Sequence, residues 1–136
     1  MSLTPQEIFD LRTEIIHSGR WQELAVHYAA DAQVRMPFAL PHPVHLEGRA
    51  AIEAHLALAD GAPLEFRVEN VVLHQTLDPE VLIAEYDYRA RATHTGHEFR
   101  IANIQLFRVR DGEIVETRDY HNHHVLGEEL RRPATA

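Results

Sequence analysis

The spacing of hydrophobic residues changes along the chain, and this change restricts the possible folds more than any other feature. Three segments within residues 4–60 have the spacing of amphipathic helices, whereas most of the sequence after residue 62 alternates between apolar and polar residues, as half-buried strands do. Helices followed by consecutive strands are typical of an α+β domain with helices packed on one face of a sheet. We therefore expect one domain over residues 1–136, with a disordered tail at 131–136.

The first helix has both of its ends marked in the stretch "TPQEIFDLRTEIIHSG". Thr4 can cap the helix, Pro5 suits the first helical position, and Glu7 completes a capping box. Gly19 can end the helix. The remaining expected elements are a short helix at 20–29, a strand at 32–38, a proline-rich loop at 39–48, a helix at 49–59, and antiparallel strands at 64–74, 81–94, 98–110 and 113–125.

Composition argues against several classes of partner. Thirteen basic and twenty-one acidic residues give a net charge of −8, and there is no run of basic residues. We therefore expect neither nucleic acid nor an anionic membrane as the main partner. The absence of cysteine excludes thiolate chemistry, and no apolar run approaches the ~18 residues of a membrane span. Without a signal-peptide pattern at the N-terminus, a cytoplasmic location is the expectation.

The segment "ETRDYHNHHV", residues 116–125, gathers two acids and three histidines. On a strand, Thr117, Asp119, His121 and His123 would share one face. These side chains suit either proton transfer or, with His42 and His45 of the proline-rich loop, a metal site. His-x-His alone is a weak metal signal, so we expect no metal.

The order of elements and four stretches, "HYAADAQVRMPFALP", "LEGRAAIEAHL", "IQLFRVRDGEIVE" and "RDYHN", resemble the SnoaL-like branch of the nuclear transport factor 2-like superfamily. The resemblance implies a cone of curved sheet, closed by three helices around an apolar pocket, and a homodimer formed through the outer face of the sheet. It also implies a small, mostly apolar, oxygenated ligand. No cofactor is implied, and the sequence has no Gly-rich phosphate loop.

The steroid isomerases of this superfamily use an aspartate base, a tyrosine and a protonated acid. Alignment of the matching stretches places Met36 at the base position, Gln105 at the acid position and Arg12 at about the tyrosine position. None of the three chemical groups is retained. Isomerase chemistry of that kind is therefore not expected, whatever the fold.

The other branches resemble this chain at the last strand, where Asp119 matches the acid/base residue of SnoaL-like cyclases and the corresponding acids of epoxide hydrolases and phenazine-biosynthesis proteins. The hydrolases add an Arg-x-Asp pair, which "EYD" matches through Asp87 but not through Glu85. Burial in an apolar pocket would raise the pKa of Asp119 toward working pH. His121 would share or orient its proton. The structural alternative is an ion pair of Asp119 with an arginine such as Arg89, Arg91 or Arg100.

The resemblance places Gln105 and Asp119 toward the pocket, and strand alternation then adds their neighbours. The expected lining residues are Trp21, Tyr28, Met36, Phe38, Phe99, Asn103, Gln105 and Phe107. Tyr86 and Tyr88 would point away from Asp87 and help to cover the dimer face. The sequence leaves open three functions: acid/base isomerisation, cyclisation or condensation through Asp119; non-catalytic binding; and epoxide hydrolysis by Asp87 with Asp119.

Overall fold

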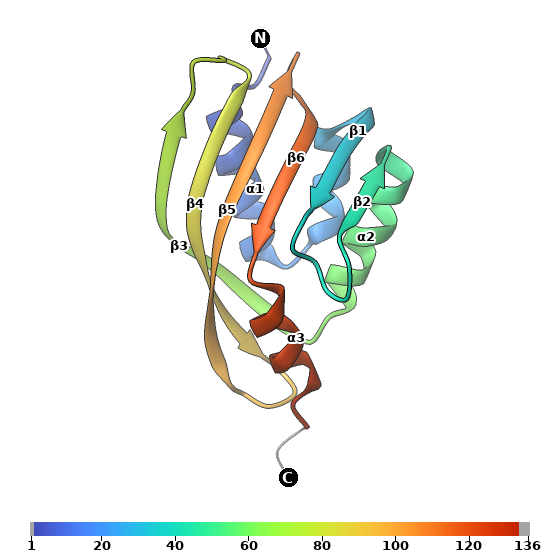
Figure 1. The fold of residues 1–136 in the computed structure, drawn as a ribbon, viewed down its shortest axis with the longest axis vertical. Coiled ribbons are helices and arrows are strands. Elements are labelled where there is room, and N and C mark those ends of the chain that lie inside the picture. Colours follow the sequence, from blue (N-terminus) through green and yellow to red (C-terminus); the bar gives the residue numbers. More distant parts are fainter. Residues whose placement is uncertain (1, 134–136) are drawn as a thin grey trace.

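The structure, a computed structural model, describes residues 2–133 and consists of one curved sheet with its helices packed against it (Figure 1). Its six strands lie in the order β2-β1-β6-β5-β4-β3. In chain order the elements are α1 (Pro5–Ser18), the 3-10 helix η1 (Trp21–His27), β1 (Tyr28–Met36), β2 (Val44–Glu47), α2 (Arg49–Gly61), β3 (Leu64–Gln75), β4 (Val81–Ala92), β5 (Glu98–Arg110), β6 (Glu113–His121) and α3 (His123–Arg131).

The helices and the sheet enclose the core between them. Helix α1 packs on β3, β4 and β5, α2 packs on η1, β1 and β2, and α3 crosses the lower end of the sheet in Figure 1. The α+β class is confirmed. None of the helices within residues 2–133 combines the length and hydropathy needed to cross a bilayer. Residues 134–136 of the expected tail lie outside the described residues, and α3 extends through Arg131.

Helix α1 begins and ends as its sequence predicts. The Thr4 side chain accepts a hydrogen bond from the Glu7 backbone N–H at 3.2 Å, and the Glu7 carboxylate accepts one from the Thr4 N–H at 2.9 Å. Gly19 ends the helix at φ 77°, a left-handed conformation that glycine adopts without the steric cost of a Cβ. The buried stripe of α1 includes one charged residue, Arg12.

Strand alternation sets which side chains face the helices. In β4, Tyr86 and Tyr88 are buried while Glu85 is exposed and Asp87 partly exposed. The prediction that the two tyrosines cover a dimer face is therefore wrong, because they point into the core against α1. In β5 and β6 the predicted inward faces are confirmed by the burial pattern.

Three features of the sheet differ from the sequence prediction. Strand β1 runs parallel to β6, so the sheet is mixed rather than wholly antiparallel. Part of the proline-rich loop pairs with β1 as the short strand β2. The last strand ends at His121, because the Asn122 side chain accepts from the Val125 N–H at 3.1 Å and begins α3. An alternating pattern reports which residues are buried, but neither the pairing direction nor a capping interaction at a strand end.

Helix α3 is held against the end of the sheet by polar contacts of Glu129, which is only 5% exposed. Its carboxylate lies 2.8 Å from Nδ1 of His97 and accepts from Nε of Arg132 at 3.1 Å. Leu126 and Leu130 of the same helix line the interior cavity described below. The position of α3 therefore determines how far that cavity is closed.

We predict that Glu129→Ala loosens α3, because it leaves its partners without the buried acceptor, at a cost of about 1–3 kcal/mol. Hydrogen exchange of the α3 amides should accelerate while exchange in β4 and β5 stays unchanged. Glu128→Ala is the matched control, since its contact with His124 is exposed. Equal exchange rates in the two variants would show that Glu129 does not hold the helix.

Candidate functional site

A cavity of about 350 Å³ lies between the helices and the sheet, and most of its wall is apolar. Trp21, Tyr28 and Met36 line it, as predicted from the sequence. The polar side chains that reach it include Arg12, His55, Gln105, Asp119, His121 and His123. A predominantly apolar hollow with a few converging polar groups is the usual form of a small-molecule site.

Asp119 is buried on the inward face of β6, with only 7% of its surface exposed. It lies opposite Gln105 in the register of β5 and β6. The Gln105 side-chain amide donates to Oδ1 of Asp119 at 2.5 Å, and Nε2 of His121 lies 3.9 Å from Oδ2. One carboxyl oxygen is thus fixed by a donor, while the other is closer to His121.

Burial raises the pKa of Asp119 from 3.8 to about 6, against the positive charge of Arg12 and the hydrogen bond from Gln105, which both lower it. The alternative arginine partners lie elsewhere: Arg89 and Arg100 pair with Glu69 at 3.6 and 3.1 Å. Arg91 lies 3.8 Å from Glu65. Those three arginines are therefore engaged on the other face of the sheet, and the ion pair considered as the structural alternative for Asp119 is not formed with any of them.

Arg12 is a residue of this site that the sequence interpretation did not include among the candidates. It is 4% exposed, and its Nη2 donates to the hydroxyl oxygens of Tyr88 at 2.9 Å and Tyr86 at 3.2 Å. The available signal was the helical pattern, since a charged residue occupies the stripe between Ile8 and Ile15. A charge on the buried stripe of a helix needs a polar partner inside the protein.

A chain of hydrogen bonds links Arg12 to Asp119. Arg12 donates to the Tyr86 oxygen, the Tyr86 hydroxyl donates to Oε1 of Gln105 at 2.8 Å, and the Gln105 amide donates to Asp119. All donors point the same way, so Oδ1 of Asp119 is an acceptor. A proton bound by this carboxyl group therefore belongs on Oδ2.

The histidines near Asp119 are neutral groups. Burial, the charge of Arg12 and the neighbouring His123 lower the pKa of His121 to about 3. Burial and the proximity of His55 lower the pKa of His123 as well. His121 can thus accept or donate a hydrogen bond in the cavity, but it does not hold a second proton near neutral pH.

His123 does not lie on the strand face where the sequence pattern placed it. It is the first residue of α3, and its side chain nevertheless lines the same cavity, with its ring centroid 5.9 Å from that of His121. His42 and His45 are exposed, and Nε2 of His45 lies 2.6 Å from the Gln33 side chain. Within residues 2–133, no three His, Asp or Glu side chains are grouped as ligands of a metal ion.

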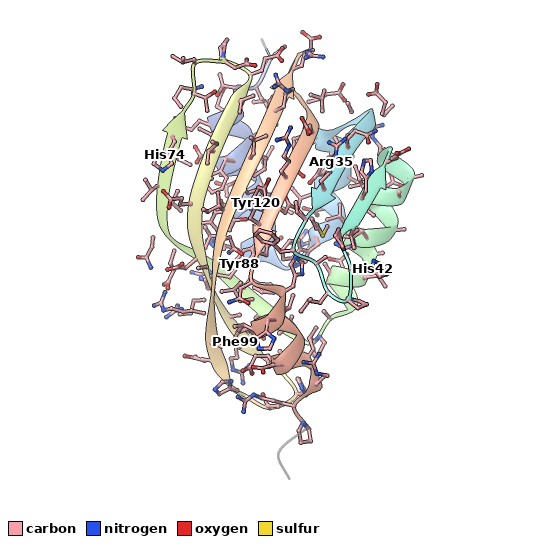
Figure 2. The ribbon with its side chains drawn as sticks, viewed as in Figure 1. Arg35, His42, His74, Tyr88, Phe99 and Tyr120 are labelled. Carbon is pink, nitrogen blue, oxygen red and sulfur yellow. The ribbon has the colours of Figure 1, made fainter. Side chains whose placement is uncertain are left out.

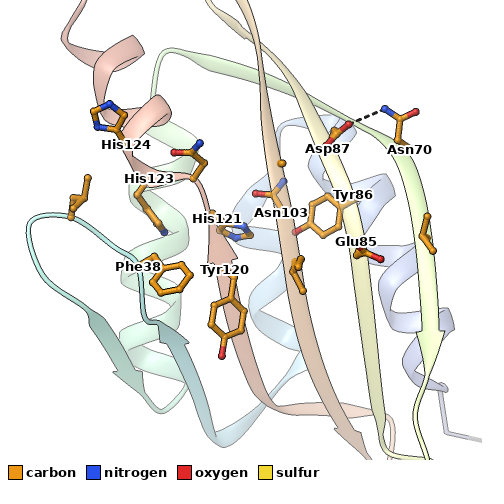
Figure 3. A pocket seen from close by; sticks show the side chains of 15 residues that line it. Phe38, Asn70, Glu85, Tyr86, Asp87, Asn103, Tyr120, His121, His123 and His124 are labelled. Carbon is orange, nitrogen blue, oxygen red and sulfur yellow. Dashed lines mark hydrogen bonds between the residues drawn. The ribbon is translucent and has the colours of Figure 1, made fainter.

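Asp87 lies on the opposite face of the sheet from Asp119. Asp87 lines a groove on the outer side of the sheet, here called the outer groove, together with Asn70 and Tyr120 (Figure 3). Asp87 accepts a hydrogen bond from Asn70 at 2.9 Å, and Nη1 of Arg100 lies 3.9 Å from its carboxylate. The two carboxylates therefore do not converge on one position. The arrangement required for epoxide hydrolysis by Asp87 with Asp119 is not formed, because their positions in β4 and β6 have opposite orientation in the pleat.

Four of the predicted lining residues lie outside the cavity. Phe38 is 64% exposed and packs edge-on against Tyr120 in the outer groove (Figure 3). Asn103 is buried but lines that groove instead. Phe99 stacks on His97, well below Tyr120 in Figure 2. Phe107 is fully buried in the core against Phe9. The prediction is wrong for Phe99, Asn103 and Phe107 because an inward orientation in β5 does not show which part of the sheet borders the cavity. It is wrong for Phe38 because this residue lies beyond the end of β1, where strand alternation no longer applies.

The buried carboxyl group predicts an unusual dependence of stability on pH. The folded protein binds the Asp119 proton more tightly than the unfolded chain, so this group lowers the free energy of unfolding as pH rises from about 4 to about 6. Asp119→Asn, which keeps an Oδ1 acceptor for Gln105, should therefore be more stable than wild type at pH 8 by about 3 kcal/mol.

Urea unfolding of both proteins at several pH values measures this difference. The difference in free energy of unfolding between the two proteins is more informative than the pH dependence of either one, because His121 acts in the opposite direction. Its folded-state pKa of about 3 lowers the free energy of unfolding as pH falls below 6.5. The gap between the two proteins should shrink from pH 8 to pH 4. A gap that stays constant would mean that Asp119 is not held at a raised pKa.

The sequence matches the family model of the SnoaL-like domain over residues 11–117. An uncharacterized PhzA/B-like protein of Pseudomonas aeruginosa is 33% identical over 121 residues, which cover 88% of this chain and 85% of that protein. An uncharacterized protein of Bacillus subtilis, YesE, is 29% identical over 112 residues, 79% of this chain and 72% of its own length.

Two solved structures show the same fold. A Bacillus subtilis protein named as a candidate isomerase superimposes with a TM-score of 0.84 at 23% identity, covering 92% of this chain and 91% of its own. A phenazine biosynthesis-related protein of Pseudomonas aeruginosa superimposes with a TM-score of 0.69 at 15% identity, covering 97% of this chain and 88% of its own. The family-model match over residues 11–117, together with the relative that is 33% identical, shows that the chain belongs to the SnoaL-like domain family.

Proposed function

We propose that the protein binds a small, mostly apolar, oxygenated molecule in the interior cavity and catalyses its isomerisation, cyclisation or condensation by proton transfer through Asp119. The observation that carries the proposal is a buried carboxyl group with a pKa of about 6 on the wall of an apolar cavity of about 350 Å³. A base whose pKa lies near the working pH combines a substantial ionised fraction with a useful affinity for the proton.

The geometry gives each polar group a role in such a step. Oδ2 of Asp119 removes a proton from a carbon beside a carbonyl group and returns it to another atom of the same molecule. Oδ1 stays hydrogen-bonded to Gln105, which keeps the carboxyl group in one orientation. The negative charge that develops on the substrate oxygen is stabilised by donors around the cavity, among them Arg12 and neutral His121.

The names of the relatives are consistent with this class of chemistry. One relative is described as PhzA/B-like, and structures of the same fold include proteins named as polyketide cyclases and as phenazine biosynthesis-related. Ring-forming and ring-modifying reactions of such molecules commonly pass through enols, whose formation needs a base near a carbonyl group. This supports an enolisable cyclic compound as the substrate.

Exchange of carbon-bound hydrogen for deuterium tests the proposal without knowledge of the product. We predict that the wild-type protein accelerates exchange at the carbons beside the carbonyl group of 1-tetralone or 2-decalone in D2O, followed by proton NMR. The rate should rise with pH through about 6 as Asp119 ionises. Asp119→Asn should slow the catalysed exchange by a factor of at least about 100.

The matched control is Asp87→Asn, which makes the same chemical change to a carboxylate in the outer groove. It should leave exchange at the wild-type rate. Retained exchange in Asp119→Asn would contradict the proposal. Binding of these ketones without any acceleration by the wild-type protein would instead favour the second hypothesis, a non-catalytic binding protein that uses the same cavity.

A homodimer formed through the outer face of the sheet stays a prediction. Exposed apolar side chains on that face include Ile104 at 46% and Val72 at 50%. Light scattering should give twice the chain mass of 15.6 kDa, and Ile104→Glu should shift the protein toward monomer. Leu77→Glu, in the β3–β4 turn, should have no effect. A wild-type mass of one chain would contradict the prediction.

A further inference from the structure

The guanidinium group of Arg12 is a buried cation without an ion-pair partner among the described residues. Only 4% of the residue is exposed, yet no carboxylate within residues 2–133 lies within 4.0 Å of it. Asp119 influences it electrostatically but is hydrogen-bonded to Gln105 instead. Removing a charged group from water is costly unless an opposite charge or several hydrogen bonds compensate, so the position of this cation needs an explanation.

The surroundings of Arg12 hold the guanidinium in one orientation. Its Nη2 donates to the hydroxyl oxygens of Tyr86 and Tyr88. The rings of Tyr86 and Phe107 lie 5.5 and 5.6 Å from its central carbon, within range of cation–π attraction. One side of the group is therefore fixed by the core, and little conformational freedom remains to be lost when a ligand binds.

The other terminal nitrogen of Arg12 has an unsatisfied hydrogen-bonding capacity. Nη1 of Arg12 is buried and has no hydrogen-bond partner within residues 2–133, and the residue lines the cavity. Nδ1 of His121 and Nε2 of His123 are likewise buried and without partners. Because these two imidazoles are neutral, Arg12 is the group among the three that carries a positive charge. The tyrosine hydroxyls beside it supply dipoles rather than a negative charge.

We propose that the cavity takes a small apolar ring compound carrying one anionic oxygen group, such as a carboxylate, and that Nη1 of Arg12 binds that group. The apolar part of the molecule would lie against Trp21, Ile52 and Phe66. This inference rests on the proposed function for its site and narrows the substrate class from an oxygenated molecule to an organic anion. Charge-assisted hydrogen bonds to a guanidinium are among the stronger polar contacts in proteins.

The test compares three ligands that share one rigid apolar cage and carry one polar group of different charge: adamantane-1-carboxylate, adamantane-1-carboxamide and 1-aminoadamantane. Calorimetry at pH 7, supported by the fluorescence of Trp21, which lines the cavity, gives the three dissociation constants. In the wild-type protein the carboxylate should bind at least tenfold more tightly than the carboxamide, and the ammonium compound should bind more weakly than the carboxylate. A carboxylate that binds no more tightly than the carboxamide, or does not bind, would overturn the proposal.

Arg12→Met removes the charge and should reduce the advantage of the carboxylate over the carboxamide to less than threefold. Arg35→Met, which changes a partly exposed arginine paired with Glu116 at 2.6 Å, is the matched control and should keep the full advantage. If the carboxylate keeps its full advantage over the carboxamide in Arg12→Met, a group other than Arg12 causes that advantage, and the proposal is overturned. Should Arg12→Met fail to fold, the wild-type ranking decides.

These measurements are independent of the exchange assay. They report selectivity between ligands at equilibrium, which requires no proton transfer by Asp119. If the protein selects the carboxylate through Arg12 but does not accelerate exchange, the anionic ligand class is supported and the catalytic role of Asp119 is contradicted. If the protein accelerates exchange of neutral ketones but shows no preference for the carboxylate, the proposed proton transfer is supported and the proposal of an anionic ligand is contradicted.

Discussion

The hydrogen-bonded chain from Arg12 through Tyr86 and Gln105 to Asp119 is the interaction on which the rest of the site depends. It connects a helix to three adjacent strands across the interior, and it sets the acceptor role of one carboxyl oxygen. The charge of Arg12 keeps the pKa of Asp119 from rising further than about 6, while burial keeps it well above 3.8. The two opposing effects leave a carboxyl group that can exchange its proton near neutral pH.

The same chain explains why polar residues occupy the centre of a domain with an apolar core. A buried guanidinium and a buried carboxyl group would each be costly alone. Tyr86 and Gln105 separate them by hydrogen bonds instead of allowing a direct ion pair, which would hold the carboxylate too firmly ionised to act as a base. The cost of this arrangement falls on stability and is compensated by the packing of the surrounding core, as is usual for functional sites.

Periodicity predicted most of the fold and about half of the site. Asp119, His121 and Gln105 were found because strand alternation and the family resemblance agree on their orientation. Arg12 was not included because its role depends on contacts with residues 74 and 76 positions away. Phe107 was misplaced because a pattern of inward residues does not show where the sheet and helices separate, and Phe38 because it lies beyond the end of β1. The last strand continued to Val125 in the prediction because a single capping side chain, Asn122, is a weak local signal.

The protonation of Asp119 in the folded protein is the central claim, and it can be observed directly. Carbon-13 NMR of the Asp119 side-chain carboxyl group, assigned by comparison with Asp119→Asn, gives its pKa from a titration between pH 3 and pH 9. The structure predicts a midpoint near 6. A midpoint near 3.8, the ordinary value for an aspartate, would show that the carboxyl group is solvated or firmly ion-paired and would contradict the account.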